Sequence, residues 1–238
     1  MAKSHNAPVF SWLALALIGS LVACTQQACK NSNTLLGMKE LTQQDKRKLL
    51  HAHNKFRDLT ASGNGLGHQP PAQNMLVLGW NEYAAQQAYS WASGCEFMHN
   101  DPKDKKNRPM GQNLYVKMSS EKENVNTTFS KYVDSMVEGW YNETKLYTFG
   151  SGFSGLTGHY TQLVWATTAK LGCGYSYYKE NNWHVGYLVC NYSPAGNMYG
   201  EDPYVTGSPN CSSFDLTPVK KYKHLCIKKP TKKNIQQT

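Results

Sequence analysis

Apolar positions recur with helical spacing in three segments of the chain. In the first segment, Leu49, His53, Phe56 and Thr60 fall on one face, and Thr42 stands three residues before an acidic residue in the spacing of a capping box. This pattern predicts a helix over about 42–61 that ends in the glycine-rich residues 63–67.

Two more helices are predicted, at residues 81–93 and at about 127–146. Alanines in the second would allow close packing, and one of its sides is marked by Trp80, Ala84, Gln87 and Trp91. The third carries an apolar stripe that we interpret as core: Phe129, Tyr132, Met136 and Trp140.

Two later segments alternate with the period of a β-strand. Residues 171–178 and 183–192 read as strands, and the polar residues 179–182 between them read as a turn, so together they predict a hairpin. Helices followed by strands indicate an α+β fold in which helices pack on a mainly antiparallel sheet.

The N-terminal residues are typical of a secretory signal peptide, which we place at 1–24. An apolar run at 9–23 follows Lys3 and ends in small residues, and at about 15 residues it is too short to span a membrane. The alternative is a bacterial lipoprotein signal that would acylate Cys24. Asn-x-Ser/Thr tripeptides favour the eukaryotic secretory route, with glycosylation predicted at Asn126, Asn142 and Asn210; a fourth, at Asn191, is weakened by a nearby proline.

The cysteine count also fits a secreted protein. Of the seven cysteines, six remain if Cys24 leaves with the signal peptide, and an even number in a secreted chain implies disulfides. Cleavage before Cys24 would instead leave a free thiol. Local order favours the pairs Cys173–Cys190 and Cys211–Cys226, which leaves Cys29 for Cys95.

The net charge of +9 is concentrated near the C-terminus. We assign residues 206–238 to a short, disulfide-containing basic tail that could bind anionic glycans, although a solvated terminus without a partner is the alternative. Nucleic acid is excluded as a partner if the protein is secreted. The lysines of this tail are Lys220, Lys221, Lys223, Lys228, Lys229, Lys232 and Lys233.

Two motifs resemble the signatures of the CAP superfamily, which contains cysteine-rich secretory proteins, antigen five and pathogenesis-related proteins. They are residues 158–168 (GHYTQLVWATT) and 187–198 (YLVCNYSPAGNM), and the sequence GQNL at 111–114 is most similar to the antigen-five branch of arthropod venom and saliva. The resemblance implies a three-layer α-β-α sandwich, with the CAP domain spanning 25–205.

The resemblance also implies a cleft with two histidines and two carboxylates. The histidines correspond to His99 and His159 and one carboxylate to Glu143, but Gln112 stands where the family has a glutamate. His99, Glu143 and His159 could bind zinc, since imidazole and carboxylate are good zinc ligands. The alternative is that these three residues and Gln112 form a hydrogen-bonded network that fixes the cleft without a metal. Hydrolysis is disfavoured because the amide of Gln112 cannot act as a general base. Tyr160 and Gln162 are expected to shape the cleft.

The function implied is that of a secreted, non-enzymatic venom or salivary protein that modulates host defence or haemostasis. Its partner would be a small lipid or sterol, a host protein or a divalent metal such as zinc. Two alternatives stay open: a weak metal-dependent hydrolase at the His99/Glu143/His159 cleft, and a glycan-binding protein acting through the segment from Lys220 to Lys233.

Overall fold

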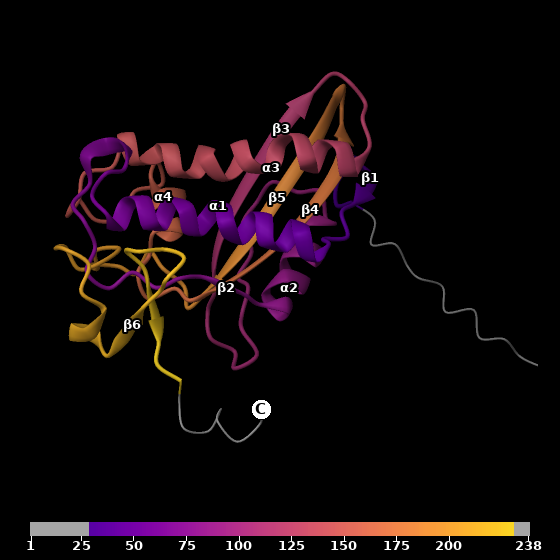
Figure 1. Cartoon of the computed structure of the whole chain (residues 1–238). Helices are drawn as coiled ribbons and strands as arrows, with labels where there is room; N and C mark the ends of the chain where they lie inside the picture. Colours follow the sequence, from indigo (N-terminus) through magenta and orange to yellow (C-terminus); the bar gives the residue numbers. More distant parts are fainter. Residues whose placement is uncertain (1–28, 231–238) are drawn as a thin grey trace, which may run out of the picture.

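The computed structural model describes residues 29–230, and Figure 1 shows their arrangement. The predicted signal peptide, Cys24, Lys232 and Lys233 lie outside the described residues. Among the residues described, none of the helices has the length and apolar character needed to cross a membrane.

The three predicted helices are confirmed, with small shifts at their ends. Helix α1 (Gln43–Ala61) begins at the Thr42 N-cap, where Thr42 and Asp45 form the expected capping box. Helix α2 spans Glu82–Ala92, and α3 (Val125–Asn142) continues into the 3₁₀ turn η2 (Glu143–Lys145). A short helix that the sequence did not predict, α4 (Gly158–Leu163), begins inside the first signature motif.

The predicted hairpin forms the centre of a five-stranded sheet. Strands β4 (Lys170–Glu180) and β5 (Trp183–Ser193) pair antiparallel, with Cys173 opposite Cys190. Strand β1 (Thr34–Met38) pairs with β4, and β3 (Gly111–Ser119) pairs with β5, both antiparallel; the two-residue β2 (Gly79–Trp80) pairs with β4 in parallel. The mainly antiparallel sheet is therefore confirmed.

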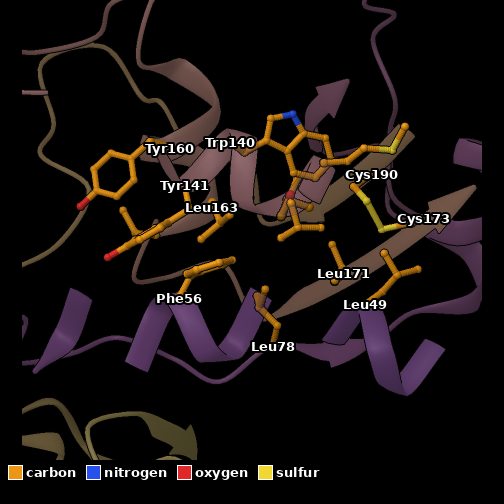
Figure 2. Close-up of a cluster of buried hydrophobic side chains, with 14 of the residues drawn as sticks. Leu49, Phe56, Leu78, Trp140, Tyr141, Tyr160, Leu163, Leu171, Cys173 and Cys190 are labelled. Atoms are coloured by element: carbon orange, nitrogen blue, oxygen red, sulfur yellow. A yellow bond between two sulfur atoms is a disulfide. The ribbon is translucent and has the colours of Figure 1, made fainter. Parts of the chain in front are cut away.

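Helices cover both faces of this sheet, as the three-layer prediction requires (Figure 1). On one face, Leu188, Cys190 and Tyr192 of β5 join the core formed with α1, α3 and α4, part of which Figure 2 shows. On the other face, Tyr187 and Val189 pack with α2. Neighbouring residues of β5 thus serve opposite cores, which explains why the strand is buried at nearly every position.

The helix α2 packs closely on the sheet through its alanines, as the sequence predicted. Its buried residues are Ala84, Ala85, Ala88 and Ala92. Two glycines of β4 make this close contact possible, because a Cβ on Gly172 would lie 2.2 Å from the Ala85 nitrogen and one on Gly174 would lie 2.4 Å from the Tyr89 Cα. Small residues on both sides bring the helix backbone against the strand.

All three predicted disulfides are present: Cys29–Cys95, Cys173–Cys190 and Cys211–Cys226. The last lies in the C-terminal segment, which folds as η3 (Cys211–Phe214) and a small hairpin of β6 (Leu216–Pro218) and β7 (Cys226–Lys228). This hairpin is attached to the domain, since Leu225 is fully buried and the Cys226 amide donates to the Met75 carbonyl. The segment assigned to a tail is thus part of the folded body as far as β7.

Candidate functional site

Glu143 links the end of α3 to the start of α4. One carboxylate oxygen accepts hydrogen bonds from the backbone amides of His159 and Tyr160, both at 3.0 Å, and the other accepts from His159 Nδ1 at 2.7 Å. The first turn of a helix has amides without intrahelical partners, and a carboxylate there satisfies them. Three hydrogen-bond donors of α4 therefore bind the Glu143 carboxylate, and these bonds fix the position of His159.

Gln112 fixes the other histidine. Its Oε1 accepts from His99 Nδ1 at 3.1 Å and from the Asn100 amide at 3.2 Å, while its Nε2 donates to the side-chain oxygens of Asn100 and Asn191. Two donors facing its oxygen and two acceptors facing its nitrogen determine the orientation of the amide. Asn100 and Asn191 are thus site residues that the motifs did not single out.

The two networks orient His99 and His159 in the same way. Each Nδ1 faces an oxygen that can only accept, so each Nδ1 carries a proton, and in the neutral ring Nε2 is the nitrogen with the lone pair. The ring centroids are 6.5 Å apart, and the Trp140 indole stacks against His159 at 6.3 Å. The site therefore offers two imidazole nitrogens as acceptors or metal ligands, with His99 exposed and His159 half-buried.

A buried chain of polar groups supports this site from the core. Asn113 donates to the His159 carbonyl at 2.9 Å and to the Tyr192 hydroxyl at 3.3 Å, and that hydroxyl lies 2.8 Å from Nε2 of His53. Burial lowers the pKa of His53 to about 4, so its ring is neutral at physiological pH. His53 thus has a structural role behind the cleft.

The two residues expected to shape the cleft lie beneath its surface. Tyr160 is fully buried, and Figure 2 shows its ring beside Tyr141 in the core. Burial raises the pKa of its hydroxyl to about 12, which makes it a poor acid or base at neutral pH. Gln162 is also buried and accepts from the Gly196 amide at 2.8 Å, so it holds the second signature motif against α4.

The predicted metal ligands are near each other, but the Glu143 carboxylate is hydrogen-bonded to the first residues of α4. Across residues 29–230, no group of three or more His, Cys, Asp or Glu side chains is arranged to hold a metal ion. The set His99, Glu143 and His159 therefore stays a prediction. The residues present fit a two-histidine site, in which Glu143 orients His159 instead of acting as a ligand.

The pocket between α1 and α3 combines apolar walls, from Ala52 and Phe56, with charged ones, which suits a lipid tail poorly. Its volume is about 360 Å³, and its walls include Lys48, Lys55, Asp134 and Glu138. Lys48 and Asp134 form an ion pair of 3.1 Å across it. A lipid would have to displace water from these charged groups without replacing its hydrogen bonds.

The predicted glycosylation sites differ in accessibility. Asn126 and Asn210 are exposed, and Asn142 is half-buried at the end of α3, next to Glu143. Asn191 is fully buried and donates to the Ala84 carbonyl, so its amide serves the interior instead of a glycan.

Comparisons with known proteins agree with this architecture. Residues 50–192 match the model of the cysteine-rich secretory protein (CAP) family. The chain is 51% identical to a salivary antigen-5 of Dipetalogaster maximus (98% of this chain, 94% of the relative) and 51% identical to one of Triatoma infestans (98% and 100%).

A solved structure described as NaASP2 with Zn²⁺ is 30% identical and superposes with a TM-score of 0.63, covering 84% of this chain and all of the other. The family model covers more than half of the chain, and the antigen-5 relatives match nearly its whole length. The chain therefore belongs to the cysteine-rich secretory protein family.

Proposed function

We propose that this protein is a secreted salivary protein of the antigen-5 type that acts on the host by binding, without catalysis, and that its cleft holds one divalent metal ion weakly. The antigen-5 relatives, named for saliva, support the site of action. Modulation of host defence or haemostasis is the role we assign to it.

The observation that carries this proposal is the commitment of the Glu143 carboxylate. Three hydrogen bonds from α4 occupy both of its oxygens, and Gln112 replaces the second carboxylate of the family pattern. A hydrolase needs a base within reach of the attacking water. The three donors that Glu143 already accepts stabilise its charged form and weaken it as a base, and Gln112 cannot take that role at all.

Zinc is the metal that the donor set fits. His99 and His159 would hold it through Nε2, since each Nδ1 is used for a hydrogen bond. The relative described with Zn²⁺ supports this assignment. When bound, the metal would supply a positive charge and open coordination positions to a ligand, and the chain would orient the two imidazoles.

Zinc titration by calorimetry at neutral pH tests the proposal. We expect one weak site in the wild type, and a loss of at least about tenfold in affinity in His99→Ala and in His159→Ala. The matched control is His184→Ala, since His184 lies on β5 and contacts Tyr177. Equal binding by all four proteins would contradict a metal site at the cleft.

Two other partners can be tested separately. A small lipid would co-purify and appear as an added mass in native mass spectrometry. Anionic glycan binding by the lysine-rich segment would give heparin retention that falls steeply with salt and with substitution of Lys220, Lys221 and Lys223. Heparin retention that is unchanged in this variant would contradict a glycan role for these lysines.

A further inference from the structure

A second pocket lies beyond the C-terminal end of α4, the opposite end from His159. It has a volume of about 480 Å³, which is within the range of small-molecule sites. Phe149, Trp165 and Tyr204 contribute aromatic walls, and the adjacent Glu201 and Asp202 contribute carboxylates.

The aromatic walls are held in place by the core. Tyr204 is 4% exposed and donates its hydroxyl to the Pro70 carbonyl at 3.0 Å, and the half-buried Phe149 ring packs against it with centroids 4.9 Å apart. Trp165 is also 4% exposed and lies against Gly196, where a Cβ would come within 2.6 Å of its ring. The rings are thus fixed before any ligand arrives, which lowers the entropic cost of binding.

The carboxylates of this pocket are uncompensated. Within the part of the chain that the structure describes, neither Glu201 nor Asp202 forms a side-chain hydrogen bond or ion pair, and none of the residues that line the pocket is Lys, Arg or His. The charge of Asp202 acts on the aromatic cluster: the pKa of Tyr147, which packs on Phe149, is raised by burial and further by the Asp202 charge.

The charge of this pocket differs from that of the other pockets described. The chain has 25 Lys and Arg against 16 Asp and Glu. Among the described residues the exposed Glu121 also lacks an ion pair, but several acids pair with lysines, as Asp45 does with Lys39 and Glu123 with Lys131. The pockets beside α1 are likewise lined by lysines together with acids. A negative, aromatic pocket in a basic protein selects a positively charged ligand.

We propose that this pocket binds a small organic ammonium ion that carries an aromatic or aliphatic group. The ammonium lies between the exposed Glu201 and Asp202 carboxylates and the half-buried Phe149 ring, whose face attracts cations, and the apolar group lies along Phe149 and the small accessible part of Trp165. A divalent metal ion would use the carboxylates but gain nothing from the rings. The site is independent of the zinc cleft and of the role proposed for it.

Calorimetry with 2-phenylethylamine, protonated at neutral pH, tests this site, and 2-phenylethanol serves as the neutral ligand of similar shape. We expect saturable binding of the amine, and affinity at least about tenfold lower for the alcohol. The double variant Glu201→Gln/Asp202→Asn should lose at least about tenfold in amine affinity. The control, Glu121→Gln/Glu180→Gln, removes the same charge outside the pocket and should bind as the wild type does.

Three results would overturn the proposal: no amine binding by the wild type, equal affinity for the amine and the alcohol, or equal losses in the pocket variant and the control. Phe149→Leu gives a further check, because Phe149 is half-buried and its loss removes an aromatic wall without removing charge. We expect weaker amine binding in this variant, with zinc binding at the cleft unchanged.

Discussion

Two polar networks contact opposite ends of α4. They differ in how many of their polar atoms are hydrogen-bonded within the chain. In the interior, Arg57 is fully buried and donates to the carbonyl oxygens of Leu76, Leu163, Trp165, Ala166 and Thr168. In the cleft, His99 and His159 each use one ring nitrogen for a hydrogen bond and keep the other free.

The difference indicates which polar residues hold the fold and which are available to a ligand. The Arg57 guanidinium binds main-chain oxygens at residue 76 and between residues 163 and 168, so its hydrogen-bonding capacity is used within the chain. His53 is likewise bonded at both nitrogens. The cleft histidines are half satisfied, which suits their remaining nitrogens to binding.

The largest effect is expected at Arg57. Arg57→Lys keeps the charge but leaves several buried carbonyl oxygens without a donor, so we expect a loss of roughly 4 kcal/mol in the free energy of unfolding. Urea denaturation followed by fluorescence measures it. The control is Arg47→Lys, because Arg47 is on the same helix and exposed. Similar stability of the two variants would show that the interior network contributes little.

A smaller effect is expected from the titration of His53. Burial lowers its pKa in the folded protein from 6.5 to about 4, so between these values the unfolded chain takes up a proton that the folded protein does not. Stability is therefore fully present above pH 6.5 and falls as the pH drops toward 4, by up to about 3 kcal/mol.

Denaturation across this pH range should show the loss in the wild type and a flatter curve in His53→Gln. His51→Gln is the matched control, since His51 is exposed on the same helix. A wild-type curve no steeper than that of His53→Gln would contradict the assignment of this pH dependence to His53.

The smallest effect on stability is expected at Glu143. In Glu143→Gln, one amide nitrogen must face a donor from α4, which should cost about 1.5 kcal/mol at this half-buried position. The variant should also bind zinc more weakly, because His159 loses the carboxylate that orients it. Glu138→Gln, exposed on the same helix, is the control, and a Glu143→Gln protein that matches it in both measurements would refute the proposed role.

Much of this fold could be predicted from periodicity. The helix α1 carries a complete capping box and a regular buried face, so local pattern and final structure agree there. The β4–β5 hairpin also forms where it was predicted, but its strands are buried on both faces instead of alternating between core and solvent. Strand β3 could not be predicted in this way: it lies at the sheet edge, with Lys117 and Met118 exposed, and its position depends on pairing with β5.

The sequence suggested four residues of the candidate site but not the hydrogen bonds that they form. Motif resemblance identified His99, Gln112, Glu143 and His159, yet the partners that fix them are distant in sequence, such as Asn191, which lies 79 positions from Gln112. The short helix α4 was also missed, since it depends on the Glu143 carboxylate supplied by the end of α3 for two of its first amides. Tertiary contacts of this kind leave no local pattern.

We expect the cleft to bind its ligand without a carboxylate that is available to coordinate it. The zinc affinity of Gln112→Glu, compared with that of the wild type, tests this most directly. The substitution adds a negative charge 3.1 Å from His99 Nδ1 and restores the family's second carboxylate. We expect zinc to bind at least about tenfold more tightly, with the gain abolished by adding His159→Ala. An affinity equal to that of the wild type would contradict a cleft whose metal binding is limited by the glutamine at position 112.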